Sequence, residues 1–260
     1  TGTPAPSPDP NATIVSSLWD SGDGATSTDA VATHTYAQDG EYTVRSIYYD
    51  TPHLECYDTK LDGLKVRRKF RIRGYDQPTD DSIVFLEIKK KYDSFIAKHR
   101  SPLLNRHLEE FLASPDLDRY ILQTSGAPCA RQDAERFLYH YYRKGLLPVV
   151  LVVYNREAFL GRFDPSLRLT FDKSLRRAAL PTPETLYDDH GLESAMPDAS
   201  IFEVKFFRQT VPGFVKSIIH RYRLPRLALS KYAMCLEAGV PTPTFAPQRL
   251  GHLAAALRRV

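Results

Sequence analysis

The stretch "GLKVRRKFRIRGY", residues 63–75, indicates the fold because its side chains alternate in character. Cations stand at every second position, at Arg67, Lys69, Arg71 and Arg73, and most residues between them are apolar. A period of two is the period of a β-strand, whose successive side chains point to opposite faces. We therefore expect a strand with one cationic face, which is unusual because a solvated face normally mixes charge signs.

The basic charge of the chain is local. The 260 residues are 42% hydrophobic with a net charge of +4, which allows a substantial core in one large or two small domains. Between Lys60 and Arg100 there are twelve basic and six acidic side chains, and the rest of the chain is slightly acidic. This distribution indicates an anionic ligand at one site rather than a generally adhesive protein.

The three cysteines, Cys56, Cys129 and Cys235, are odd in number and widely spaced, without a CxxC or zinc pattern. No apolar run approaches the roughly 20 residues that span a membrane. No signal-peptide pattern is present, although the sequence begins at Thr1 rather than at Met. We expect a cytoplasmic protein with no membrane span in this chain.

Residues 1–41 are expected to carry no chemistry. Residues 1–12 are rich in Pro, Ser and Thr and are typical of a flexible lead-in. The stretch "LWDSGDGATSTDAVATHTYAQDGEYTV" (18–44) resembles the second half of a PKD (polycystic-kidney-disease) domain, a small extracellular β-sandwich. That resemblance gives an extracellular or cell-surface location as the alternative, and a turn-rich loop is the ordinary interpretation of the same residues.

The remaining sequence predicts many strands with a helical insert. Strands are expected at 42–50, 63–75, 83–92, 95–103, 147–161, 167–178 and 200–208. Helical spacing occurs at 103–113, 132–145 and 211–224, and residues 227–239 are expected to close the core. This order is typical of an α+β fold with an antiparallel barrel-like sheet.

Several of these strands repeat the alternation with charged or polar side chains on one face. The sets are Glu87 with Lys89, Lys98 with Arg100, Tyr154 with Arg156, Arg168 with Thr170 and Asp172, and Glu203 with Lys205. If the apolar faces pack outward, the charged faces look at one another, and burying such cations without counter-ions costs several kcal/mol per ion. The interior must then be wet and hold a dense anion. Phosphate chains fit, because Arg and Lys both pair with phosphoryl oxygens.

Glu87 and Glu203 would sit badly beside a polyanion unless Mg²⁺ or Mn²⁺ bridges them to the phosphates. Each set also has an ordinary interpretation as an ion pair. Ser230 could simply be a helix N-cap with Lys231 in solvent. Nucleic-acid binding by a basic face would predict duplex affinity that falls steeply with salt. It is disfavoured because no base-stacking aromatic residues alternate with the basic positions.

The segments "YTVRSIYYD", "GLKVRRKFRIRGY", "VFLEIKKK", "IAKHRSPL", "VVYNREAF", "LRLTFD", "FEVKF" and "LSKY" occur in the order of the VTC domain, which residues 42–239 resemble. This family is the polyphosphate polymerase domain of vacuolar transporter chaperones and of many bacterial proteins. It belongs to the triphosphate tunnel metalloenzymes, relatives of the CYTH phosphatases. The resemblance implies an eight-stranded antiparallel tunnel lined with Arg and Lys and flanked by helices, followed here by a tail at 240–260.

The resemblance also implies roles for individual residues. Catalytic roles fall on Arg71, Arg73, Lys89, Arg156, Arg168 and Lys231. Substrate-binding roles fall on Lys69, Lys98, Arg100, Tyr154, Lys205 and Ser230. The metal, Mn²⁺ or Mg²⁺, falls to Glu203, with Glu87 as the second carboxylate, and Arg45 is a weaker candidate for the tunnel wall.

One departure concerns the start of the domain. The family opens with a strand that reads roughly E-x-K-Y, and nothing in residues 1–41 matches it. A missing strand would leave a barrel seam open and expose strand edges. We therefore expect activity to be reduced or absent if that strand is lacking.

The leading hypothesis is an enzyme that transfers the terminal phosphoryl group of a nucleoside triphosphate, such as ATP, to a polyphosphate chain. With water as the acceptor, the same site would be a tripolyphosphatase. A non-catalytic polyphosphate-binding module is the alternative from another class.

Overall fold

The computed structural model describes residues 19–20, 26–27, 41–93, 95–124, 126–161, 164, 166–206 and 210–239. The strands are β1 (Trp19–Asp20), β2 (Thr26–Ser27), β3 (Glu41–Asp50), β4 (Val66–Tyr75), β5 (Ile83–Tyr92), β6 (Phe95–Leu104), β7 (Leu147–Leu160), β8 (Arg168–Ala179), β9 (Glu193–Ser194) and β10 (Ile201–Lys205). The helices are α1 (Glu55–Leu61), η1 (Asn105–His107), α2 (Leu108–Ala113), α3 (Leu117–Tyr120), α4 (Ala130–Lys144), η2 (Pro183–Tyr187), α5 (Gly213–Arg221) and α6 (Lys231–Glu237). Most of the PKD-like stretch and the tail at 240–260 lie outside the described residues.

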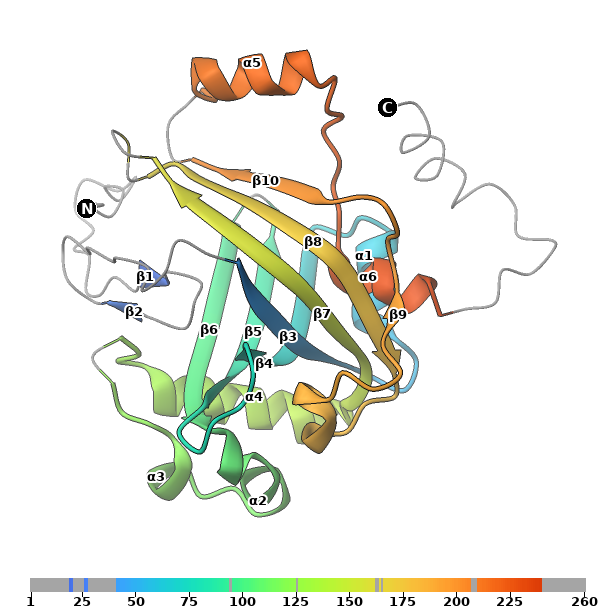
Figure 1. The fold of residues 1–260 in the computed structure, drawn as a ribbon. Helices are drawn as coiled ribbons and strands as arrows, with labels where there is room; N and C mark the ends of the chain where they lie inside the picture. Colours follow the sequence, from blue (N-terminus) through green and yellow to red (C-terminus); the bar gives the residue numbers. More distant parts are fainter. Residues whose placement is uncertain are drawn as a thin grey trace.

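One eight-stranded antiparallel sheet organises the domain (Figure 1). Its strand order is β10-β8-β7-β3-β4-β5-β6, with the short β9 paired to β8. The predicted α+β class and the antiparallel strands are confirmed. The sheet is strongly curved but not closed: β10 and β6 are its two ends, and no ladder joins them among the described residues. The word barrel therefore describes the curvature of the sheet and not a continuous wall.

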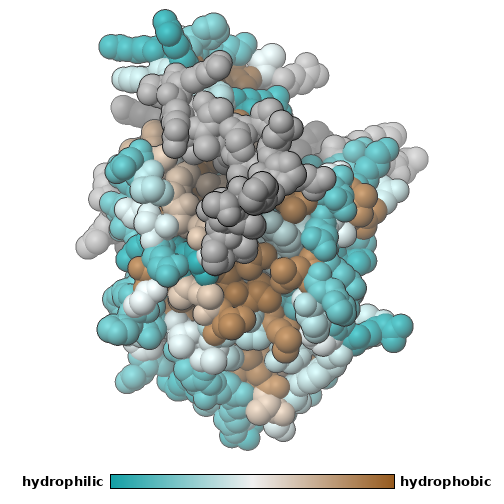
Figure 2. All heavy atoms as spheres, turned by 90° about the vertical axis from the view of Figure 1, so that its right-hand side faces the viewer, coloured by the Kyte–Doolittle hydropathy of each residue, from teal (hydrophilic) through white to brown (hydrophobic). Residues whose placement is uncertain are grey.

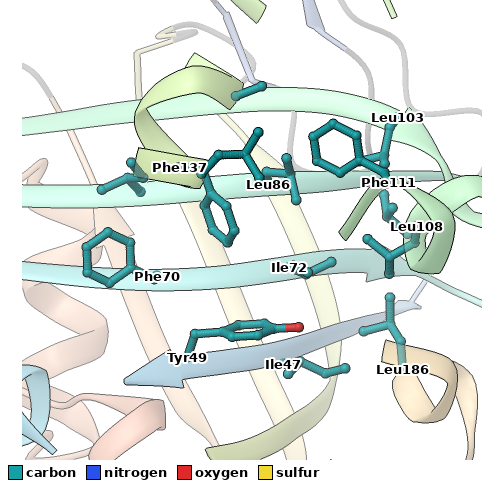
Figure 3. Packing of buried hydrophobic residues seen from close by; sticks show 14 of the residues in the cluster. Ile47, Tyr49, Phe70, Ile72, Leu86, Leu103, Leu108, Phe111, Phe137 and Leu186 are labelled. Atoms are coloured by element: carbon teal, nitrogen blue, oxygen red, sulfur yellow. The ribbon is translucent and has the colours of Figure 1, made fainter. Parts of the chain in front are cut away.

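The convex face of the sheet carries the main hydrophobic core. The apolar positions that alternate with the cations of β4, Phe70 and Ile72, are fully buried there (Figure 3). They pack with Tyr49 of β3 and with Phe137, which projects from α4. Burial of a side chain such as Phe137 contributes about 1.5–3 kcal/mol. The alternation predicted from residues 63–75 is thus confirmed, with the apolar half facing the helices.

Helix α4 ends at a glycine C-cap. Gly145 follows the last residue of the helix with a φ of 56°, and its N–H donates to the Tyr142 carbonyl at 3.3 Å. This left-handed C-cap favours glycine, because other residues pay a steric cost there. The turn lets Leu147 begin β7 directly after the helix, and β7 then crosses the middle of the sheet beside β3.

Helix α6 packs on the concave face of the sheet, opposite the main core. Tyr232 and Cys235 of this helix are buried against a smaller apolar cluster that includes Val152 and Tyr154 of β7. Figure 2 views the molecule from the side where α1 and α6 lie in Figure 1, and apolar residues gather in the middle of that side. None of the described helices is long and apolar enough to cross a membrane.

Candidate functional site

The register of the ladders places the predicted cations on one face, because directly opposed residues share a face of the sheet. One row across the sheet consists of Tyr48 (β3), Arg71 (β4), Glu87 (β5) and Arg100 (β6). A second row consists of Lys69, Lys89 and Lys98. The strands at the other end of the sheet add Arg156 opposite Asp172, Arg168 opposite Lys205, and Thr170 opposite Glu203.

The result is a concave face with a large excess of positive charge. Among the described residues, its cations include Lys69, Arg71, Arg73, Lys89, Lys98, Arg100, Arg156, Arg168, Lys205 and Lys231. Its carboxylates include Glu87, Asp172 and Glu203. The structure therefore brings all the predicted site residues together, with Tyr154 and Ser230 completing the set beside Lys231.

Arg45, the weaker candidate for the tunnel wall, lies elsewhere. It stands between Val44 and Ser46 on β3, so its side chain emerges on the opposite, convex face. There it donates to Asp189 at 2.8 Å and to the Asp76 carbonyl at 3.1 Å. Its place is explained by the period of the strand, which puts Ser46 and Tyr48 on the concave face instead.

Glu87 is the centre of a closed ionic cluster. Its side chain is 1% exposed, and it accepts from Arg71 at 2.6 Å. Its other oxygen lies 3.1 Å from Lys98 Nζ and 3.2 Å from Arg100 Nε. Burial alone would raise the pKa of Glu87, but Arg71, Lys98 and the neighbouring arginines outweigh burial and hold it well below the usual range. Because both of its oxygens face cations, Glu87 is better placed to act as a counter-ion for them than as a metal ligand.

Asp172 forms the second closed cluster. Arg156 donates to both of its oxygens, at 2.6 and 2.8 Å, a bidentate geometry that fixes the guanidinium. Lys231 Nζ lies 2.5 Å from the same carboxylate and 4.7 Å from the ring centroid of Tyr154. Asp172 was grouped with Arg168 by its spacing, but its partners could not be read from the sequence because they come from β7 and α6.

Glu203 differs from the other two carboxylates because it is open. Its side chain is 39% exposed, and its nearest cations, Arg156 and Lys205, are 3.6 and 3.7 Å away. Burial would raise its pKa, yet Lys205, Lys231 and Arg156 lower it, so it is ionised at neutral pH. Among the described residues no three His, Cys, Asp or Glu side chains gather into a metal site. One open carboxylate still fits a divalent ion that takes its remaining ligands from phosphates and water.

Two of the three lysines in the row, Lys69 and Lys89, have no carboxylate partner among the described residues, whereas Lys98 pairs with Glu87 at 3.1 Å. Lys89 pairs with no carboxylate of the described residues, and its pKa is lowered by burial and by Arg71. Lys69 donates to Ser230 Oγ at 2.7 Å, and burial lowers its pKa to about 8. Tyr48 also has a pKa of about 8, because Arg71, Arg73 and Lys69 outweigh the effect of its burial. The face is therefore charged in a way that an added polyanion would relieve.

A buried chain of contacts holds α6 against this face. Tyr232 donates to Asp50 Oδ2 at 2.5 Å, and Asp50 also accepts from the backbone N–H groups of Cys56 and Tyr57. The Tyr232 ring stacks on Tyr48 with a centroid distance of 5.0 Å. Sequence reasoning missed these residues, and the only signal was the tyrosine pair before Asp50 in "RSIYYD".

The ordinary alternative for Ser230 and Lys231 holds in part: Ser230 is a helix N-cap, but Lys231 pairs with Asp172 and is not in solvent. Its Oγ accepts from the Ala233 N–H at 3.3 Å and so caps α6. The same oxygen accepts a hydrogen bond from Lys69 Nζ of β4 at 2.7 Å. The cap thus ties the start of α6 to the cationic strand and aims Lys231 at Asp172.

Comparison with known proteins gives independent evidence about the family of this chain. The VTC domain family matches residues 21–239, a range that contains the predicted 42–239. Subunit 4 of the vacuolar transporter chaperone complex of Trypanosoma brucei brucei is 26% identical over 158 residues, covering 52% of this chain and 20% of that protein. A microbial collagenase of Vibrio alginolyticus is 60% identical over 53 residues, covering 20% of this chain and 6% of the collagenase.

The chain spans at most about a fifth of the length of either relative, so neither whole protein describes it. The collagenase match is short, and the PKD-like resemblance stays a prediction. The family match is different in kind, because it covers most of the chain and every strand of the large sheet. The chain belongs to the VTC domain family.

Proposed function

We propose that the chain is a polyphosphate polymerase-like enzyme that works on its concave face. It binds a nucleoside triphosphate and a polyphosphate chain and transfers the terminal phosphoryl group to that chain. The observation that carries this proposal is the row of Lys69, Lys89 and Lys98 beside Arg71, more positive charge than Glu87 can neutralise. Membership of the VTC family and the similarity to a vacuolar transporter chaperone subunit support it.

The residues would act by positioning and by neutralising charge, as a loose phosphoryl-transfer transition state requires. Arg156 is held rigidly by Asp172, so its guanidinium is preorganised for the phosphates. Lys89 and Lys205 have pKa values lowered by burial, and a phosphate between them would stabilise their charged forms. Lys231, with Ser230, would contact the end of the chain next to α6.

The atoms of the transfer balance without a covalent enzyme intermediate. An oxygen of the terminal phosphate of the chain attacks the γ-phosphorus, and the bond to the bridging β–γ oxygen breaks. The nucleoside diphosphate leaves with that electron pair. When bound by Glu203 and the phosphates, Mn²⁺ or Mg²⁺ supplies further charge neutralisation. With water as the attacking group, the same residues would release free phosphate.

One structural observation favours a second candidate, a binding module without activity. The sheet is open between β6 and β10, and these edges carry Lys98, Arg100, Glu203 and Lys205. Substrate held beside an open edge is in contact with water, which weakens each charge interaction. Such a face would still bind polyphosphate but would transfer phosphoryl groups slowly or not at all.

The test is an assay of the purified chain with ATP and Mn²⁺ that follows long-chain polyphosphate and free phosphate together. Polymer that is absent in Glu203→Gln and present in the surface variant Glu157→Gln supports the polymerase. Free phosphate alone would make the chain a hydrolase. Neither product, with tripolyphosphate binding retained, would leave the binding module.

A further inference from the structure

The end of the β5–β6 hairpin exposes an apolar cluster that the proposed reaction does not use. Val66, Tyr92 and Phe95 are directly opposed across β4, β5 and β6, and Ile96 follows Phe95. Their exposed fractions are 42%, 62%, 72% and 57%. The Asp93 N–H donates to the Lys65 carbonyl at 3.0 Å, so the turn and the start of β4 form one tip. Scattered exposed apolar residues are ordinary, but three directly opposed ones, with Ile96 on the other face of the same hairpin end, indicate a contact surface.

Cations surround this cluster, which we name the hairpin tip and define as Val66, Tyr92, Phe95 and Ile96. The adjoining cations are Lys65, Arg67, Arg68, Lys90 and Lys91. None of these five pairs with a carboxylate of the described residues, and Asp93 in the turn forms no ion pair with them. Burial and the positive charges of Arg68, Lys144 and Lys90 lower the pKa of His140 on α4, which shows that the field extends to the helix.

We propose that the hairpin tip docks on an anionic lipid surface. Aromatic and aliphatic side chains at the end of a rigid hairpin can enter the boundary between headgroups and acyl chains, where Tyr and similar rings are favoured. The surrounding cations would face the anionic headgroups, each strengthening binding about fivefold. A protein partner would need complementary shape, whereas a lipid surface requires only this arrangement of apolar and basic groups.

The tip lies at the edge of the candidate site. Val66, Tyr92 and Phe95 each stand three residues before or after a member of the row of Lys69, Lys89 and Lys98. Three residues of strand span about 10 Å, since the rise is about 3.3 Å per residue. Docking through the tip would therefore bring the lysine row within about 10 Å of the lipid surface, whatever reaction the site performs.

The experiment measures co-sedimentation of the purified chain with phosphatidylcholine vesicles that do or do not contain a third of phosphatidylglycerol. We expect binding to the anionic vesicles alone, weakened by salt. The double substitution Tyr92→Ser and Phe95→Ser should weaken binding at least tenfold, and Lys90→Gln with Lys91→Gln about twentyfold or more. The matched control is Leu180→Ser, which changes an exposed apolar residue outside the tip and should bind as wild type.

Three outcomes would overturn the proposal. The first is no binding to anionic vesicles, which is also the result expected if a protein covers the tip. The second is wild-type binding by the Tyr92/Phe95 variant, with circular dichroism confirming that it is folded. The third is loss of vesicle binding when tripolyphosphate saturates the concave face, because headgroups would then be entering the phosphate site and not meeting the tip.

Discussion

Glu87 and Glu203 stand in the same E-x-K pattern, followed by Lys89 and Lys205, and both face the concave side of the sheet. Glu87 lies on β5, between two strands that each supply basic side chains, and its oxygens face Arg71, Lys98 and Arg100. Glu203 lies on β10, at the end of the sheet, and its ion pairs with Arg156 and Lys205 are longer, at 3.6 and 3.7 Å.

The difference teaches that position in the sheet, and not the motif, decides what a carboxylate can do. A central strand has neighbours on both sides, so its acid becomes a buried counter-ion. An edge strand has one neighbour, so its acid keeps coordination sites for a metal and phosphates. The same substitution should therefore lower stability at Glu87 and lower turnover at Glu203.

The largest effect is expected for Glu87→Gln. Removing its charge leaves three cations in a buried cluster without their counter-ion, which costs about 3–5 kcal/mol of stability. Chemical denaturation measures the change. The control Glu157→Gln removes an exposed partner of Lys173 and should change stability far less than Glu87→Gln. Equal losses in the two variants would remove the distinction between the clusters.

Glu203→Gln should leave stability within about 0.5 kcal/mol, since the carboxylate is exposed and its ion pairs with Arg156 and Lys205 are long, at 3.6 and 3.7 Å. It should lower metal-dependent turnover about 100-fold, because Glu203 is more exposed than Glu87 and Asp172 of the same face and is therefore the one open to an ion. Rates measured across a range of Mn²⁺ concentrations test this. A variant that lost stability but kept its rate would show that the two carboxylates had been assigned the wrong way round.

Lys89→Ala should weaken tripolyphosphate binding about tenfold, the value of one charge-assisted contact of about 1.4 kcal/mol. Stability should not fall, because Lys89 has no counter-ion among the described residues and is repelled by Arg71. Titration calorimetry compares it with Lys90→Ala, the adjacent residue on the opposite face. Equal losses for both lysines would mean that binding is not confined to the concave face.

The last expected effect is on the pH dependence of binding. Lys69 and Tyr48 both have pKa values of about 8, and the forms that favour a bound polyanion are protonated lysine and neutral tyrosine. Affinity for tripolyphosphate should therefore fall as pH rises from 7 to 9, by at most about tenfold per pH unit for each proton. Lys69→Arg should flatten the profile. An affinity that rose with pH would contradict this account of the lysine row.

Much of this site could be predicted from the sequence because period-two spacing fixes the face of each residue within a strand. This spacing alone was enough to place Lys69, Arg71 and Arg73 on one face. Register is different, since which side chains oppose one another depends on ladders between distant segments. For that reason the sequence did not show that cations from other strands and from α6 occupy the oxygens of Glu87 and Asp172.

The resemblance implied an eight-stranded tunnel, with an open seam if its opening strand is lacking, and the sheet does end at β6 and β10 among the described residues. The packing of α6 was less predictable. Residues 227–239 were expected to close the core, but the contact of Tyr232 with Asp50 joins residues 182 positions apart. Helical periodicity carries no information about such a partner.

The most direct test of the central claim is calorimetric titration of tripolyphosphate into the wild type and Glu203→Gln, with and without Mn²⁺. Both proteins should bind tripolyphosphate without metal, because the cations of the concave face are unchanged. Mn²⁺ should tighten binding in the wild type and have no such effect in the variant. Absence of binding in both proteins, or an undiminished Mn²⁺ effect in Glu203→Gln, would contradict the account.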